Sequence, residues 1–149
     1  MTFLSWRKEY EIGVAAIDAE HRRLVGMAND FNATRAEGDS PEDAGKMLTR
    51  LIAYAEEHFQ REEQLMRENG YPRLDTHQAQ HAAYFFNIFA VNKANALNPA
   101  AASAGVLKVL KQWLLVHVLR EDMDLAEFLR RKTIADERAA AAPEPPRQA

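Results

Sequence analysis

The sequence predicts an all-α protein that folds as an up-down-up-down four-helix bundle with an N-terminal arm and a short C-terminal helix or extension. Four long segments carry apolar residues at helical spacing, and short runs of cap and turn residues separate them. Beyond the arm we find no strand-like alternation, and no internal repeat stands out. With 149 residues, of which 47% are hydrophobic, the chain is large enough for one domain with a real core.

The two ends of the chain differ from the segments between them. We expect one domain over residues 1–138, with an arm at 1–17 and the bundle at 18–132. Gly13 interrupts any helix in the arm, so aromatic residues such as Trp6 are expected to pack the arm across the domain. From position 139 the low-complexity, proline-rich stretch AAAAPEPPRQA predicts a disordered tail at 139–149.

The first bundle helix is expected from about Ala19 to Glu37. Asp18 is the candidate N-cap residue, because a short side-chain oxygen there can accept a bond from a free backbone N–H. His21 lies on or near the apolar stripe of this helix, and Gly38 marks its end. The stripe comprises Leu24, Ala28 and Phe31.

The second helix is expected to start at Ser40 and run to about Asn69. Ser40 can cap it, Pro41 fits the first helical position, and the acidic residues that follow favour the positive end of the helix dipole. Gly70 is a typical residue for ending a helix. The inner stripe comprises Met47, Leu48, Leu51, Tyr54, Ala55, His58, Glu62, Leu65 and Met66.

The third helix is expected from about Leu74 to Leu97, and the fourth from near Ala100. Asn98-Pro99 separates them. The apolar pattern of the fourth helix continues to Leu129, and the pattern leaves open whether the helix breaks near Asp122. The third stripe carries His77, His81, Tyr84, Phe85, Ile88 and Val91, and the fourth carries Val106, Leu107, Val109, Leu110, Trp113, Leu114 and His117.

Composition excludes several classes of protein. The chain has no cysteine, which excludes disulfides, thiolate zinc sites and cysteine-ligated iron–sulfur clusters. Basic and acidic residues are nearly equal in number, with a formal net charge of -3. We therefore expect no nucleic-acid surface and no polybasic membrane patch. The N-terminus lacks a basic region followed by an apolar one, and no run approaches the length of a membrane span. We therefore expect a cytoplasmic protein without membrane insertion.

The histidines are the most informative residues. All five fall in the inward-facing pattern, and every expected helix contributes at least one; they are His21, His58, His77, His81 and His117. When a protein has a single histidine in its core, one hydrogen-bonding neighbour usually satisfies it. Five buried imidazoles, with none left for the surface, would each need partners for two ring nitrogens. A shared metal centre satisfies them together.

Two carboxylates join this set. Glu62 lies four residues after His58 and therefore shares its helix face. Asp122 lies five residues after His117, about 140° away on a regular α-helix. Helical spacing alone would prefer Glu121 as the partner of His117, and a solvated acidic helix end is the simplest interpretation of this region.

The sequence resembles the bacterial hemerythrins along roughly residues 6 to 130. HxxxE, HxxxH and HxxxxD in this order, after a lone upstream histidine, form a very specific signature. The matching residues are Trp6, Gly13-Val14, Ile17 to His21, Tyr54 to Glu63, Met66, Gly70-Tyr71-Pro72, His77, His81, Trp113-Leu114, His117 and Asp122. This resemblance selects Asp122 over Glu121 and implies a local departure from α geometry, such as a π-type turn.

The resemblance implies a non-haem di-iron centre. His77, His81 and His117 would hold one iron, and His21 and His58 the other. Glu62 and Asp122 would bridge the two iron ions, which would also share an oxo or hydroxo bridge. For two six-coordinate ions, this ligand set leaves one position open on the iron with two histidines, as a ligand-binding site requires. The family's apolar O2 pocket would comprise Leu24, Phe59, Trp113, Leu114 and Val118.

Side chains around the ligands should orient the imidazoles. The candidates are Asp18, Glu20 and Tyr54, although a cap or surface role is the simpler interpretation of Asp18 and Glu20.

The first hypothesis for function is reversible O2 binding by a non-enzymatic carrier, store or delivery protein. Ligation rich in imidazole and poor in carboxylate favours reversible binding over oxidation of a substrate. The alternatives are a module that senses O2 or NO through a partner protein, a di-iron oxidase or peroxidase, and a metal-free bundle. The expected partners are O2 and, as one candidate recipient, an O2-consuming enzyme, with the chain a monomer or weak oligomer.

Overall fold

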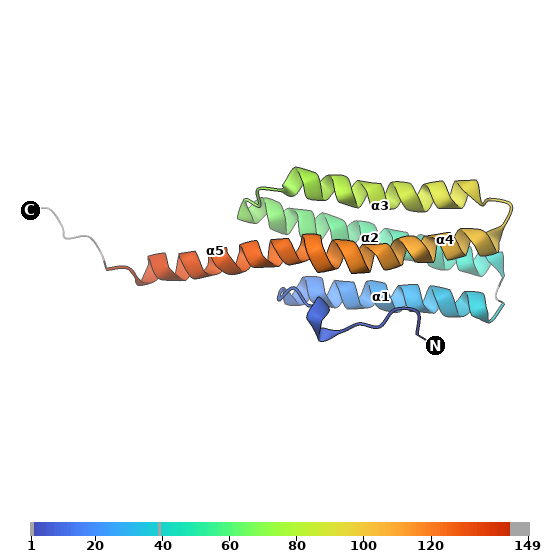
Figure 1. The fold of residues 1–149 in the computed structure, drawn as a ribbon, viewed down its shortest axis with the longest axis horizontal. Coiled ribbons are helices and arrows are strands. Elements are labelled where there is room, and N and C mark those ends of the chain that lie inside the picture. The colour runs from blue at the N-terminus through green and yellow to red at the C-terminus, as the bar shows by residue number, and fades with distance from the viewer. Residues whose placement is uncertain (1, 39, 144–149) are drawn as a thin grey trace, which may run out of the picture.

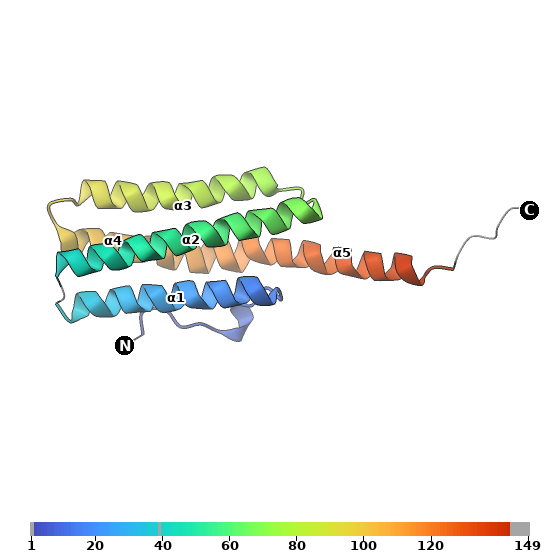
Figure 2. The same ribbon diagram turned by 180° about the vertical axis from the view of Figure 1, so that it is seen from behind.

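A computed structural model describes residues 2–38 and 40–143. Four helical segments run up, down, up and down around a common core (Figures 1 and 2). They are α1 (Ala15–Ala36), α2 (Pro41–Asn69), α3 (Leu74–Ala94) and α4 (Pro99–Gln112). The described residues contain no strand, so the predicted all-α bundle is confirmed.

The start of α1 differs from the prediction. Asp18 is not the N-cap residue, because α1 begins at Ala15 after Val14, which makes no side-chain capping bond. Asp18 lies inside the first turn and is buried. Its carboxylate accepts bonds from the backbone N–H groups of Ile12 (2.7 Å) and Gly13 (3.1 Å). The carboxylate therefore secures the end of the arm, while its negative charge also suits the helix N-terminus.

The arm before α1 lies along that helix (Figure 1) and contains the short 3₁₀-helix η1 (Lys8–Tyr10). Leu4 is buried, and its backbone forms two 2.8 Å hydrogen bonds with the Asn29 side-chain amide. The Trp6 ring packs 5.6 Å from the Tyr10 ring and 6.2 Å from the His21 ring, measured between centroids. The arm thus closes one side of the bundle, as its aromatic residues predicted.

The ends of α2 match the predicted signals. The Ser40 hydroxyl accepts a bond from the Asp43 N–H, and Pro41 occupies the first helical position. Gly70 ends the helix in the left-handed conformation with φ of 68°, which a residue with a Cβ adopts only at a cost.

The α3–α4 connection is longer than predicted, because α3 ends at Ala94 rather than near Leu97. Both the backbone N–H and the side-chain amide of Asn95 donate to the Val91 carbonyl at this end of the helix. Asn98 then caps α4 by accepting from the Ala101 N–H.

The helix after α4 does not break. It continues through the π-helical segment η2 (Trp113–Asp122) into α5 (Met123–Ala141), which projects beyond the bundle (Figure 1). Residues 139–141, which we expected in the tail, are helical, because alanine has the highest helix propensity. The helix stops there because a residue before proline, here Ala142 before Pro143, disfavours helical backbone. Residues 144–149 of the predicted tail lie outside the described residues.

Length and composition alone would allow the continuous helix Pro99–Ala141 to cross a membrane. In the most apolar 18-residue stretch of this helix, 44% is buried within the protein. Within the same helix, η2 carries His117 and Asp122 into the protein interior. The buried apolar residues of this helix, such as Val106, Leu110 and Leu114, belong to the core of the bundle.

Two apolar clusters lie on either side of a buried polar layer. The larger one joins all four helices and includes Leu24, Phe31, Leu51, Val106 and Leu114. The smaller one comprises Met66, Tyr71 and Leu125. Along α2 and η2, the polar residues singled out by the sequence are His58, Glu62, His117 and Asp122, and all four are buried where the two clusters meet.

Candidate metal centre

All seven predicted ligands meet in the buried layer between the two apolar clusters. Helix α1 contributes His21, α2 contributes His58 and Glu62, α3 contributes His77 and His81, and η2 contributes His117 and Asp122. Each of these residues is at most 2% exposed. Because every helix of the bundle supplies at least one donor, the complete set exists only in the folded chain.

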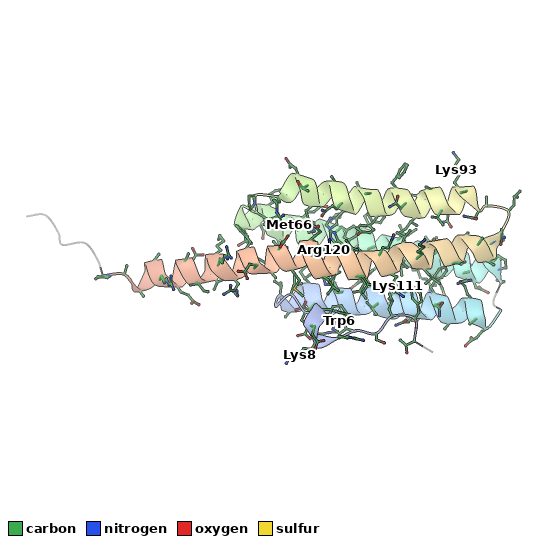
Figure 3. All side chains as sticks on the ribbon, viewed as in Figure 1. Trp6, Lys8, Met66, Lys93, Lys111 and Arg120 are labelled. Carbon is green, nitrogen blue, oxygen red and sulfur yellow. The ribbon has the colours of Figure 1, made fainter. Side chains whose placement is uncertain are left out.

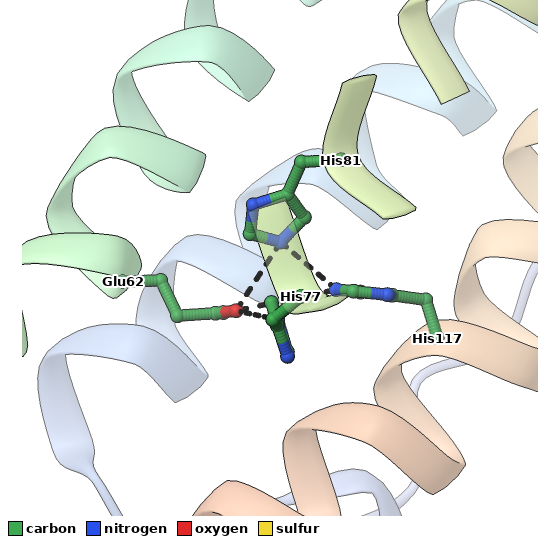
Figure 4. A group of neighbouring side chains, drawn as sticks. All are labelled: Glu62, His77, His81 and His117. Carbon is green, nitrogen blue, oxygen red and sulfur yellow. Dashed lines mark hydrogen bonds and ion pairs between the residues drawn. The ribbon is translucent and has the colours of Figure 1, made fainter. Parts of the chain in front are cut away.

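Three imidazoles form the first group. Nε2 of His81 lies 3.0 Å from Nε2 of His117, and the His77 ring lies beside both (Figure 4). Glu62 Oε1 lies 2.6 Å from His77 Nε2 and 3.3 Å from His81 Nε2. Asp122 Oδ1 lies 3.1 Å from Nε2 of both His77 and His117.

Two imidazoles form the second group. Nε2 of His21 and Nε2 of His58 face each other at 3.1 Å. Glu62 Oε2 lies 3.4 Å from His58 Nε2, and Asp122 Oδ2 lies 3.2 Å from His21 Nε2. Each carboxylate therefore turns one oxygen to each group.

The π-helical segment η2 explains how Asp122 reaches the site. In a π-helix the backbone bonds join residues five apart, so Asp122 lies one turn beyond His117 and on the same side. In a regular α-helix, Glu121 would take that place. Here Asp122 is fully buried and Glu121 is partly exposed. The predicted departure from α geometry is confirmed.

The donor set fits metal ions. Glu62 Oε2 and both oxygens of Asp122 are buried and accept no hydrogen bond, although they lie among imidazole nitrogens. Buried charges of this kind are normally paired or bound to a metal. Two overlapping groups have donor atoms within 4.8 Å of one another: Glu62, His77, His81 and His117 form one, and His21, His58 and Glu62 form the other. Nitrogen and oxygen donors without sulfur suit first-row metals such as iron.

The two carboxylates also shift the pKa values of two imidazoles in the centre. Burial lowers the pKa of His21, but the nearby carboxylates of Asp122 and Glu62 outweigh this effect and raise the pKa to about 9. The same balance raises the pKa of His77 to about 9. For Glu62, burial raises the pKa, but the surrounding imidazoles lower it well below its usual value. Metal ions must therefore displace these protons when they bind.

Two carboxylates outside the cluster orient two of the imidazoles. Glu20 Oε2 lies 2.7 Å from His58 Nδ1, and Glu20 also pairs with Arg61. Glu63 Oε1 lies 2.7 Å from His81 Nδ1, and Gln78 donates to the other oxygen of Glu63. An Nδ1–H that donates to a carboxylate leaves the Nε2 lone pair directed at the centre.

The sequence-based candidates for this orienting role had mixed outcomes. Glu20 contacts His58, whereas Asp18 binds the backbone of the arm instead. The ring of Tyr54 lies under the Arg23 guanidinium. Sequence reasoning missed Glu63, although it belongs to the matching stretch Tyr54 to Glu63. Glu63 and His81 are 18 residues apart and lie on different helices, so no local sequence pattern indicates their contact.

The surroundings of the centre are apolar. Phe59 stacks on the His81 ring with 3.8 Å between centroids, and Trp113 packs edge-on 5.5 Å from the His21 ring. Both line a cavity of about 20 Å³ together with Leu24. A space of about 10–15 Å³ is enough for one water-sized molecule.

The predicted O2-pocket residues divide into two sets at this cavity. Leu24, Phe59 and Trp113 line it, whereas Leu114 and Val118 are buried in the same core but are not among its walls. Tyr84, whose ring lies 5.5 Å from the His117 ring, also lines the cavity and was not predicted to do so.

Comparison with known proteins identifies relatives of this arrangement. A family model described as the hemerythrin HHE cation binding domain matches residues 12–129. The chain is 27% identical to a bacteriohemerythrin of Stenotrophomonas maltophilia, over 85% of this chain and 82% of that protein. It is 28% identical to a bacteriohemerythrin of Clostridium acetobutylicum, over 80% of this chain and 95% of that protein. It is 27% identical to the myohemerythrin of Theromyzon tessulatum, over 78% of this chain and 86% of that protein.

Proposed function

The chain belongs to the hemerythrin family, which implies an O2-binding di-iron centre, and we propose that it binds O2 reversibly as a carrier, store or delivery protein. In this proposal His77, His81 and His117 hold one iron, and His21 and His58 hold the other. Glu62 and Asp122 bridge the two ions.

The division of the seven buried donors into two unequal groups carries this proposal. Both carboxylates direct one oxygen to each group, as bridging ligands must. The group of His21 and His58 has one imidazole fewer than the other. An iron held there keeps a free coordination position, which a binding site needs and a structural site lacks.

The apolar cavity supports reversible binding rather than substrate oxidation. Its walls, which include Leu24, Phe59 and Trp113, exclude water, protons and anions that would promote oxidation of the iron. Its volume of about 20 Å³ suits a diatomic gas and leaves little room for an organic substrate. An O2-consuming enzyme is the expected recipient of the gas.

The test is a spectroscopic titration of the iron-loaded chain. We expect the reduced protein to gain a visible absorption band when O2 is admitted and to lose it when O2 is removed under vacuum, over repeated cycles. Irreversible loss of the band, with steady consumption of a reductant, would overturn the carrier function in favour of an oxidase.

Sensing is the second candidate, and the continuity of the helix Pro99–Ala141 favours it. This helix carries His117 and Asp122 and then leaves the bundle as α5 (Figure 1). A shift at the centre could therefore reach a partner that binds α5. Trypsin cleavage at Arg130 and Arg131 distinguishes the two functions: a rate that depends on O2 favours sensing, and an unchanged rate favours carriage.

A further inference from the structure

One row of residues along the outer side of α3 has no partner within the described bundle. Asp75, Ala79, Ala82, Phe86, Phe89 and Lys93, which we name the α3 seam, follow one another at spacings of four, three, four, three and four. All six are exposed, Phe86 at 71% and Phe89 at 57%. Two such phenylalanines side by side are unusual on a surface where nothing binds.

The seam lies on the side of α3 that faces away from the bundle. His77, His81 and Ile88 are the buried residues of α3, and the helix packs against α2, α4 and η2. Both ribbon views place α3 at the edge of the bundle (Figures 1 and 2), and the Lys93 side chain points outward from it (Figure 3). The α3 seam therefore plays no part in the core or in the metal centre.

We propose that the α3 seam binds the same seam of a second copy of this chain in an antiparallel pair of helices. Alternating spacings of three and four define the contact row of a two-stranded coiled coil. A closed two-fold dimer requires a surface that is complementary to itself. The α3 seam meets both requirements.

The order of residues along the seam is complementary when one copy is reversed. About a midpoint at Tyr84, Asp75 of one copy faces Lys93 of the other. In the same register Ala79 faces Phe89, and Ala82 faces Phe86, so each large side chain meets a small one. A parallel pairing would instead place Asp75 against Asp75 and phenylalanine against phenylalanine.

The charges of α3 favour a second copy over a charged partner. Residues 76–92 contain no Asp, Glu, Lys or Arg. Depletion of charge with enrichment of aromatic residues is typical of the centre of a protein–protein interface. The only charges on the seam are Asp75 and Lys93 at its two ends, where each finds the opposite charge on the reversed copy.

The seam predicts a weak dimer. From Asp75 to Lys93 it is about 27 Å long at 1.5 Å per residue, which is a short contact for two helices. We therefore expect an equilibrium between monomer and dimer that depends on protein concentration.

Sedimentation equilibrium of the full iron-loaded chain over a range of concentrations tests the proposal. The unaltered chain should dimerise, and Phe86→Glu should raise the dimer dissociation constant by at least about tenfold. Lys46→Asp, a charge reversal at an exposed position of α2, is the matched control and should leave the constant unchanged.

A charge exchange tests the antiparallel register. Asp75→Lys or Lys93→Asp alone should weaken the dimer, because like charges then face each other at both ends. The double variant Asp75→Lys/Lys93→Asp should restore it. Each substitution also places an unfavourable charge at one end of the α3 dipole. If this destabilisation of the single chain weakened the dimer, the double variant would be weaker than either single variant instead of being restored.

Two results would overturn the proposal. One is a chain that stays monomeric at all concentrations tested. The other is a dimer that tolerates Phe86→Glu and both charge reversals, because it would then use another face. The proposal is independent of O2 binding, and iron content checks that each variant folds, since α3 carries His77 and His81 on its inner side.

Discussion

At the scale of single residues, the link between the two groups of imidazoles depends on individual carboxylate oxygens. Asp122 shows this most clearly. Its two oxygens lie 3.1 Å from His117 Nε2 and 3.2 Å from His21 Nε2, so one side chain connects two groups from opposite parts of the chain. Glu62 does the same from α2. Because each carboxylate turns one oxygen to each group of imidazoles, the two groups depend on each other.

We predict that Asp122→Ala lowers the iron content well below the full di-iron complement, because both groups lose an oxygen donor. Glu121→Ala is the matched control, since Glu121 is the neighbouring acid and is partly exposed, whereas Asp122 is buried among the histidines. It should retain nearly all of the iron. Metal analysis after anaerobic reconstitution measures both variants. Loss of iron from Glu121→Ala alone would reverse the assignment of the bridge.

At the scale of the elements, the ends of α2 set the position of the site along the bundle. The Ser40 cap and the Gly70 stop determine where α2 begins and ends, and His58 and Glu62 lie between them on one face. The left-handed conformation of Gly70 lets the chain turn directly into α3, which carries His77 and His81.

We predict that Gly70→Ala lowers the free energy of unfolding by about 1–2 kcal/mol, because an L-residue resists the left-handed conformation. Gly45→Ala provides the matched control within α2. Gly45 is helical, and a Cβ there meets nothing within 4 Å. This variant should raise the free energy of unfolding by about 0.5–1 kcal/mol. Urea denaturation at equal iron content measures both, and equal effects of the two substitutions would contradict the prediction.

At the scale of the whole molecule, the metal centre links all four helices of the bundle. Seven buried polar groups interrupt its core. Burial opposes charge on His21 and His77, yet the two carboxylates raise the pKa of each to about 9. The stability of the fold should therefore depend on both metal and pH.

The sign of the pH dependence follows from these shifts. The folded-state pKa of His21 and His77 exceeds the usual 6.5, so their stabilising contribution is complete below pH 6.5 and is lost as the pH rises toward about 9. The pKa of Glu62 is lowered below 4.5, so its contribution is present above pH 4.5 and is lost in acid. Deprotonated imidazoles bind metal more strongly, so iron acts in the opposite direction in the alkaline range.

We predict that the melting temperature of the metal-free chain falls between about pH 6.5 and 9, and that added iron raises it more at pH 9 than at pH 6.5. Anaerobic thermal denaturation with chelator or with ferrous iron measures both effects. The variant Lys46→Asp, which alters only an exposed pair with Glu42, should follow the same profile. A metal-free melting temperature that is constant across this range would contradict the prediction.

The sequence by itself determined the local features of this protein. Apolar residues at helical spacing predicted the bundle, and Ser40, Pro41 and Gly70 predicted the ends of α2. Placement of all five histidines on the inner faces also followed from spacing. These features depend on residues within a turn or two of one another, so a single chain segment contains the whole signal.

Only the tertiary structure decided the features that depend on distant contacts. Local spacing favoured Glu121, and only the resemblance to the hemerythrins pointed to Asp122. The π-helical geometry brings Asp122 against imidazoles of α1 and α3, which are distant in sequence. The early start of α1, where Asp18 binds the arm, and the contact of Glu63 with His81 likewise join separate segments. Local spacing carries no information about such pairs, because packing of the whole bundle sets their distances.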